Sequence, residues 1–268
     1  MTVSTPARQT APRKASAARL AVVVERPAQA PDANLSPTAR QLLDVAEKLF
    51  AERGIESVSL REIVAASGQR NGSAAQYHFG TREALVGLLI ARRVWFINEM
   101  RHARLDALEA AGRADDVRTV VSESILVLAD AVREQAWGPD YVRIAAQVLL
   151  NPAAVFRAVP DDHYWSGHAR VSLMLERLLP KLPAQTFHDR MRIVNNETVY
   201  SVARWIHAHG PVTPATRERY DALVRHTIEF LAAGMGAPTA TPAAKRTTTR
   251  AIKTAAAPRR TPAAKARR

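Results

Sequence analysis

The sequence contains no cysteine and no long apolar run. The absence of cysteine excludes disulfide bonds, a cysteine nucleophile and thiolate metal sites. No apolar run approaches the roughly 18 residues that a membrane helix needs, and the run at 20–24 is too short for the core of a signal peptide. These absences predict a soluble, cytoplasmic protein with no membrane partner.

Signatures of catalysis are missing as well. The sequence has no nucleophile elbow, no glycine-rich phosphate loop and no zincin motif. Its eight histidines do not show the paired spacing that is typical of metal ligands. We therefore expect no enzymatic activity, no metal site and no cofactor.

The positive charge is concentrated at the two ends of the chain. The net charge is +13, of which residues 1–36 carry +3 and residues 235–268 carry +9, so that 37–234 is almost neutral. Both ends are rich in alanine and proline and contain few large apolar side chains. Such segments bury too little apolar surface to offset the backbone entropy lost on folding. We expect a disordered extension over 1–36 and a disordered basic tail over 235–268.

The basic tail has two interpretations. Its two Pro-Ala-Ala-Lys segments, at 242–245 and 262–265, are similar to the tails of histone-like proteins that bind DNA without sequence preference. Nine cationic side chains would add affinity that falls steeply with salt. The alternative is a solvated terminus with no dedicated role.

The middle of the chain has the periodicity of helices throughout. Ser36 and Pro37 are typical of a helix start, and Gly54 of a helix end. Ser59 and Glu62 have the spacing of a capping box, whereas Glu47 falls on the polar, wet face of the first helix. The expected helices cover 37–53, 60–66, about 71–79, 82–108, 115–134, 139–150, 162–179, 184–209 and 214–233. No alternating strand pattern occurs, so the predicted fold class is all-α.

The two short helices over 60–66 and 71–79, joined by residues 67–70, form a predicted helix-turn-helix. Small residues over 72–75 allow the second helix to approach the floor of the major groove closely. The side chains suited to bond base edges are Arg70, Asn71, Ser73 and Gln76. Arg61 and Arg82 are expected to reach flanking phosphates, near the capped helix end at Ser59.

At these residues the chain resembles the tetracycline-repressor (TetR) family of bacterial transcription regulators. The resemblance is carried by residues 46–54 (AEKLFAERG), 58–63 (VSLREI), 67–68 (SG) and 77–85 (YHFGTREAL). It departs from the family pattern by one extra residue between Gly68 and Tyr77. The resemblance implies that Ser59, Arg61, Tyr77, His78 and Arg82 contact or adjoin the DNA backbone, although His78 and Tyr77 are also suited to packing at the helix end.

The resemblance also implies a division into domains. A three-helix DNA-binding domain over 37–97 would precede a larger helical domain for effector binding and dimerisation over 98–234. The helices near 184–209 and 214–233 carry apolar faces that need a partner helix, from the same chain or from a second one. The resemblance favours the second chain, and hence a homodimer.

Aromatic and polar side chains of the second domain are candidates for a ligand pocket. The alternative is that most of them are ordinary core residues. The candidates are Trp137, Tyr141, Phe156, Tyr164, Trp165, His168, Asn195 and Trp205.

The sequence therefore predicts a sequence-specific, DNA-binding transcriptional regulator, in the form of a repressor released by a small-molecule effector. It is expected to act as a homodimer on a palindromic, double-stranded DNA operator in the nucleoid. The alternative is an architectural, largely non-specific DNA-binding protein that relies on its basic tails.

Overall fold

The computed structural model describes residues 29–150 and 165–239. Within those ranges all regular structure is helical, with nine α-helices and one short 3-10 turn. The all-α prediction is confirmed. None of the described helices combines the length and the apolar character that a bilayer span requires.

The first helices follow the local signals of the sequence. Helix α2 (Pro37–Arg53) begins after Ser36, whose hydroxyl oxygen accepts a hydrogen bond from the Ala39 amide at 3.2 Å. It ends at Gly54, which has a φ of 90° that other residues rarely adopt. The turn η1 (Ile55–Ser57) then leads to α3 (Leu60–Ala66) and α4 (Ala74–Phe79).

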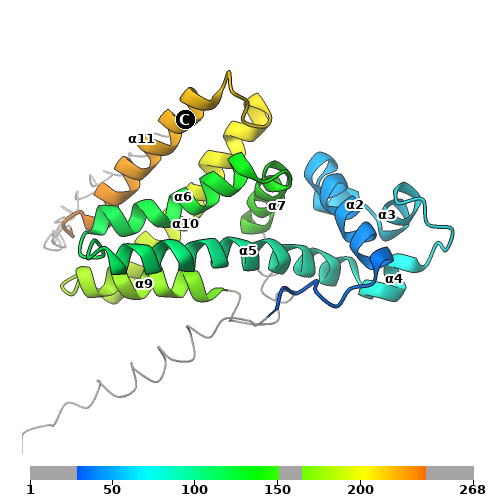
Figure 1. Cartoon of the computed structure of the whole chain (residues 1–268), viewed down its shortest axis with the longest axis horizontal. Coiled ribbons are helices and arrows are strands. Elements are labelled where there is room, and N and C mark those ends of the chain that lie inside the picture. Colours follow the sequence, from blue (N-terminus) through cyan, green and yellow to red (C-terminus); the bar gives the residue numbers. More distant parts are fainter. Residues whose placement is uncertain (1–28, 151–164, 240–268) are drawn as a thin grey trace, which may run out of the picture. The chain divides into compact units, whose positions relative to one another are not determined.

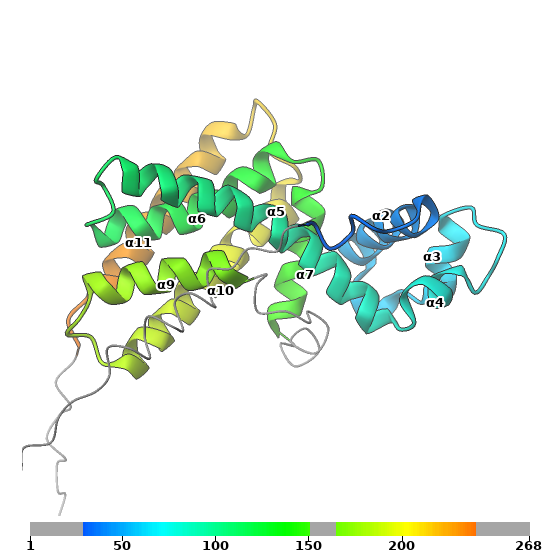
Figure 2. The ribbon, with the colours of Figure 1, turned by 60° about the horizontal axis from the view of Figure 1, so that its bottom comes forward.

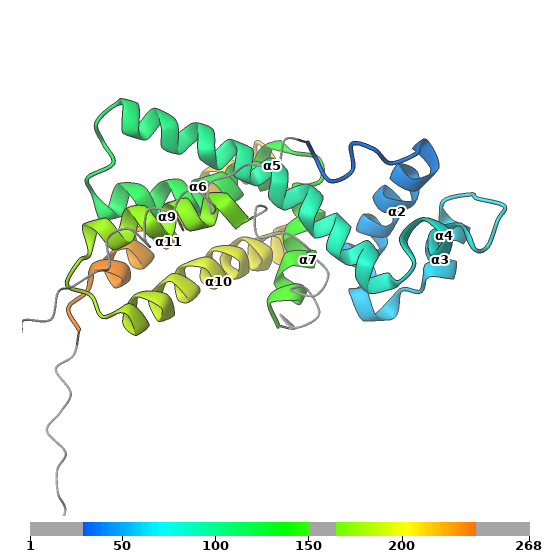
Figure 3. The same ribbon diagram turned by 90° about the horizontal axis from the view of Figure 1, so that it is seen from below.

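The remaining helices form a second group, which the long helix α5 (Arg82–Ala110) joins to the first helices, as Figure 1 shows. Helix α6 (Val117–Glu134) packs against α5, α7, α9 and α11 and lies at the centre of this group. The other members are α7 (Gly138–Leu150), α9 (Ser166–Leu178), α10 (Ala184–His209) and α11 (Arg217–Gly236). Figure 2 shows α9 beside α5, and Figure 3 shows α10 beside α7.

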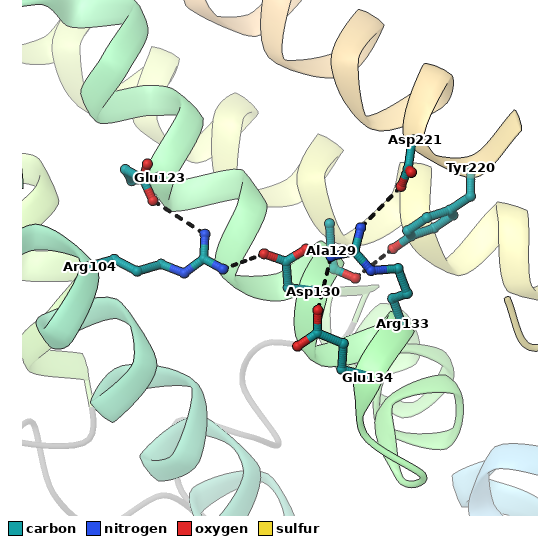
Figure 4. A network of polar contacts seen from close by, with 8 residues as sticks. All are labelled: Arg104, Glu123, Ala129, Asp130, Arg133, Glu134, Tyr220 and Asp221. Carbon is teal, nitrogen blue, oxygen red and sulfur yellow. Dashed lines mark hydrogen bonds and ion pairs between the residues drawn. The ribbon is translucent and has the colours of Figure 1, made fainter. Parts of the chain in front are cut away.

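A polar network fixes α5, α6 and α11 relative to one another (Figure 4). Arg104 of α5 pairs with Glu123 and Asp130 of α6. Arg133 of α6 binds Asp130 at 2.6 Å and reaches Asp221 of α11 at 3.1 Å. In addition, the Tyr220 hydroxyl of α11 donates to the backbone oxygen of Ala129 in α6 at 2.9 Å. Three helices are therefore held by directional contacts as well as by apolar packing.

The structure corrects three boundaries. Helix α4 begins at Ala74 and not near 71, because Asn71 and Ser73 form a turn in which the Asn71 side-chain oxygen accepts from the Ser73 amide at 3.0 Å. At the start, Asp32 pairs with Arg92 of α5 at 2.7 Å, so residues 29–36 are ordered against the fold and not part of a disordered extension. At the end, α11 continues to Gly236 and Met235 is buried, so the predicted tail begins too early. Residues 1–28 and 240–268 lie outside the described part.

Candidate nucleic-acid interface and effector site

The helix-turn-helix is held by a small apolar core. Ile63 and Val64 of α3 pack with Ala74 and Ala75 of α4, and all four are buried. The side-chain amide of Gln41 in α2 donates to the backbone oxygen of Ser67 at 3.0 Å, which ties the turn to the preceding helix. Because the small residues of α4 face inward, its other side faces away from the protein.

Most of the predicted DNA contacts are exposed to solvent. Arg61, Arg70, Asn71, Ser73, Gln76 and Tyr77 are exposed, as is Ser59, whereas His78 and Arg82 are half-buried. Tyr77 is 83% exposed, and the edge of its ring contacts the His78 ring at a centroid distance of 5.1 Å. An exposed tyrosine next to several polar side chains is typical of a binding surface rather than of a core.

Two of the predicted contacts have structural partners already. Arg82 binds the Glu56 carboxylate at 2.7 Å and the backbone oxygen of Glu56 at 3.2 Å, so it braces the turn before α3. The Ser59 hydroxyl forms the predicted capping box with Glu62, which also binds Arg53 at 2.5 Å. The Ser59 amide and hydroxyl, together with Arg53, hold the pKa of Glu62 at about 2. Ser59 and Arg82 therefore stabilise the frame of the helix-turn-helix.

A buried ion pair joins α2 to α5 and was missed by the sequence analysis. Arg93 binds both carboxylate oxygens of Glu47, with Nε 2.8 Å from Oε1, and both side chains are buried. The guanidinium also lies 4.5 Å from the ring centroid of Trp137, which precedes α7. The placement of Glu47 on a wet face was wrong, because α5 and α7 cover that face.

Helix α7 also contacts the end of α2 and the turn η1 directly. The Gln147 side-chain oxygen accepts from the Ile55 amide at 2.9 Å, and its nitrogen donates to the Phe50 backbone oxygen at 3.4 Å. Helices α2 and α7 pack along each other. Helix α7 is therefore joined to the end of α2 and to the turn that leads to α3.

The predicted pocket residues fall into two places. Trp137 and Tyr141 contact each other edge to face, with ring centroids 5.9 Å apart. Trp165 and His168 of the α9 region lie 5.7 Å apart. Both pairs lie near Arg101 of α5. Its Nη1 atom is 3.3 Å from His168 Nδ1, and its positive charge interacts with the Tyr141 phenol.

The other predicted residues lie elsewhere. Trp205 stacks on His209 at 4.1 Å and contacts Tyr220 of α11, so it belongs to the packing between α10 and α11. Asn195 is half-buried on α10. Phe156 and Tyr164 lie outside the described residues.

Arg101, Asn98 and His102 were not among the predicted site residues. Asn98 and Arg101 are one helical turn apart on α5, are buried, and interact through a 3.0 Å hydrogen bond. His102 contacts the Ser166 hydroxyl of α9 at 3.1 Å. The available signal was the spacing of Asn98, Arg101 and His102, which places three polar side chains on one face of the helix. Within the described ranges, no group of three His, Cys, Asp or Glu residues has the geometry of a metal site.

Two models of protein families match the chain. "Bacterial regulatory proteins, tetR family" matches residues 42–89, and "Tetracyclin repressor-like, C-terminal domain" matches 127–234. A solved structure with a similar fold is the transcriptional regulator FadR from Bacillus subtilis in complex with stearoyl-CoA. It is 14% identical, with a TM-score of 0.50 over 73% of this chain and 98% of that one. A TetR-family regulator from Streptomyces coelicolor A3 is 19% identical, with a TM-score of 0.29 over 79% of this chain and 98% of that one. No curated protein sequence matches.

Proposed function

Because this chain belongs to the TetR family of DNA-binding transcriptional regulators, we propose that it is a repressor released from its operator by a small-molecule ligand. It would act in the cytoplasm as a homodimer on a palindromic site. We assign DNA binding to residues 37–97 and effector binding and dimerisation to 98–234. The observation that carries the proposal is the outer side of the helix-turn-helix, where polar side chains surround a helix whose inner face is alanine.

The residues of this surface divide into two groups by chemistry. Gln76 on α4, with Arg70, Asn71 and Ser73 in the turn before it, is assigned to the base edges. Arg61, Tyr77 and His78 are assigned to the phosphates, where hydrogen bonds position the protein without reading sequence. Ser59 and Arg82 lie beside them and keep the helix ends in place.

Dimerisation is assigned to α10 and α11. Most of the apolar face expected to pair across a twofold axis is buried within the chain itself, because α10 and α11 pack on each other and on α6 and α7. Two large apolar side chains remain on the surface of these helices: Phe230 of α11 is 77% exposed and Ile193 of α10 is 52% exposed. They support a second copy as the partner. A dimer also meets a physical need, since two recognition helices about one DNA turn (~34–36 Å) apart double the base contacts.

Release by a ligand requires a connection between the two domains. Helix α5 begins at the helix-turn-helix and reaches α9 in the effector domain. Helix α7 contacts α2 at one side and carries Tyr141 beside Arg101 at the other. A ligand that prefers one arrangement of α5 and α7 shifts the population away from the spacing that fits the operator.

The test measures binding of the full-length protein to the DNA upstream of its own gene, with scrambled DNA of equal length as the control. Arg70→Ala is compared with Arg113→Ala, which removes the same charge from an exposed position in the loop between α5 and α6. Loss of one base contact should cost about 1–3 kcal/mol of discrimination, or about fivefold to 150-fold in the preference ratio. Arg113→Ala should keep the preference. An equal loss in both variants would contradict the assignment.

The architectural alternative predicts a different result. Truncation must begin at residue 240, because Arg190 binds the backbone oxygens of Met235 and Ala237 at 2.9 and 2.6 Å. If the tail only adds non-specific affinity, deleting 240–268 flattens the salt dependence and preserves the preference for the operator. If the truncated chain loses both affinity and discrimination, the architectural function replaces the proposed one. If the upstream DNA is not the operator, selection from random oligonucleotides supplies the site.

A further inference from the structure

Arg101 is a buried cation without a counterion among the described residues. Its side chain is on α5, and the residue is 2% exposed. Nη1 donates to the Asn98 side-chain oxygen at 3.0 Å and lies 3.3 Å from His168 Nδ1. Nε has no hydrogen-bond partner. The guanidinium therefore has an N–H donor, at Nε, that forms no hydrogen bond with the protein and is shielded from water.

The neighbouring arginines of the same helix differ in this respect. Arg93 binds Glu47 through two hydrogen bonds, and Arg104 binds Glu123 and Asp130. Arg82 and Arg92 of α5 also bind carboxylates, so Arg101 is the one arginine of this helix without a carboxylate partner among the described residues. A buried and uncompensated charge is strongly unfavourable. A contribution to stability therefore does not explain why Arg101 lies here, and a function in binding does.

The groups around Arg101 do not neutralise it. Burial lowers the pKa of Arg101 to about 10, so it is still protonated near pH 7. Burial and the Arg101 charge hold the pKa of His168 well below its usual range, so the imidazole is neutral. Burial raises the pKa of Tyr141 to about 12, so the phenol is neutral too. The net charge of this cluster is therefore positive.

Helix α9 lies so close to Asn98 and Arg101 of α5 that a side chain at position 167 would not fit between the two helices. A Cβ atom on Gly167 would lie 2.5 Å from the Asn98 side-chain oxygen and 3.2 Å from Arg101 Cδ. Gly167 therefore lets α9 approach α5 closely and fixes the base of the guanidinium. Aromatic rings flank the cluster, with Trp165 against His168 and Trp137 against Tyr141.

We propose that the effector has a carboxylate, which Arg101 binds, and an apolar body, which packs on the flanking aromatic rings. The proposal rests on the proposed function, and names the ligand class for the same effector domain. An arginine is suited to this role because its fork of donors matches the two oxygens of a carboxylate. Inorganic phosphate is the other source of an oxyanion with the same chemistry.

The site lies where a ligand can influence DNA binding. Tyr141, beside Arg101, belongs to α7, and Gln147 of the same helix binds the Ile55 amide next to the DNA-binding helices. Trp137, which contacts Tyr141, lies under the Arg93 guanidinium that pairs with Glu47 of α2. An anion on Arg101 therefore acts on the helix that connects the two domains.

The test compares three probes on three proteins. The probes are octanoate, 1-octanol and inorganic phosphate, and the proteins are the full-length wild type, Arg101→Met and the control Arg113→Met. Without a probe, Arg101→Met should raise Tm, because it removes an unpaired buried charge, whereas Arg113→Met should leave Tm unchanged. Octanoate should stabilise the wild type and Arg113→Met, and calorimetry should give an affinity at least about tenfold weaker for Arg101→Met. Octanol should not distinguish the three proteins.

Four results would overturn the proposal. These are a lower Tm for Arg101→Met without a probe, equal affinity of octanoate for wild type and Arg101→Met, no binding of octanoate to the wild type, and stabilisation by phosphate alone. Operator binding of the ligand-free proteins separates the two hypotheses. If the wild type shows no operator preference, the proposed function fails, while the Tm and calorimetric results still decide the anion site.

Discussion

Replacing Glu47 by methionine should destabilise the protein far more than breaking an exposed pair of the same two residue types. Glu47 and Arg93 are 3% and 8% exposed, and they join α2 of the DNA-binding region to α5. In Glu47→Met the Arg93 guanidinium stays buried with no carboxylate. Removing one partner of a buried pair costs about 3–5 kcal/mol. Because a folded domain is stable by about 5–15 kcal/mol, this loss is a large fraction of the total.

The double variant Glu47→Met with Arg93→Met should behave differently. Burial outweighs the attraction of Arg93 and raises the pKa of Glu47. Buried ion pairs pay a desolvation penalty, and apolar side chains of similar volume can often replace both partners at little cost. The double variant should be close to the wild type and more stable than either single variant.

The assay is urea unfolding followed by circular dichroism, with the midpoint and slope compared for each variant. The control is Arg53→Met, which breaks the exposed pair to Glu62, whose side chains are 46% and 42% exposed. That pair should contribute about 0–1 kcal/mol. The reasoning is refuted if Glu47→Met loses no more stability than Arg53→Met, or if the double variant loses the sum of the two single losses.

Three further predictions concern other parts of the fold. Gly138→Ala should destabilise the protein by about 1–3 kcal/mol in thermal unfolding, because a Cβ atom at this position would lie 2.5 Å from the Ala131 backbone oxygen. The control Gly234→Ala should not lower the stability, since a Cβ atom there meets nothing within 4 Å. If the proposed dimer forms through this face, the wild type should sediment as a dimer and Phe230→Glu as a monomer, without a lower Tm, since the ring is 77% exposed. A Phe230→Glu dimer would exclude this face. The pKa of Glu62 is about 2 in the folded protein and near 4.5 in the unfolded chain, so its ionised carboxylate stabilises the fold at pH values above about 4.5. This stability is lost as the pH falls toward about 2. The Tm difference between wild type and Glu62→Gln should therefore shrink over that range, and a constant difference would argue against the capping box as its source.

The effector region illustrates how sequence and structure divide the information. Aromatic residues were chosen for the pocket because such side chains are common in ligand sites, and this criterion grouped Trp205 with Trp137 and Tyr141. In the structure Trp205 packs on His209 and Tyr220, while the polar residue between the remaining rings is Arg101. An arginine on a long helix is usually solvated, whereas Arg101 is buried where α9 approaches α5 closely at Gly167.

The sequence by itself determined the fold class, the ends of the first helix and the start of α3, and the helix-turn-helix. These features depend on contacts between residues three or four positions apart, such as the capping box of Ser59 and Glu62, and on single residues such as Gly54. Tertiary structure alone decided that Glu47 is buried, that Gln147 holds the turn at Ile55, and that Arg101 lacks a carboxylate among the described residues. The Ile55–Gln147 contact spans 92 positions and the Glu47–Arg93 pair 46. Which side chains meet at such separations depends on how whole helices pack, and local periodicity carries no information about that.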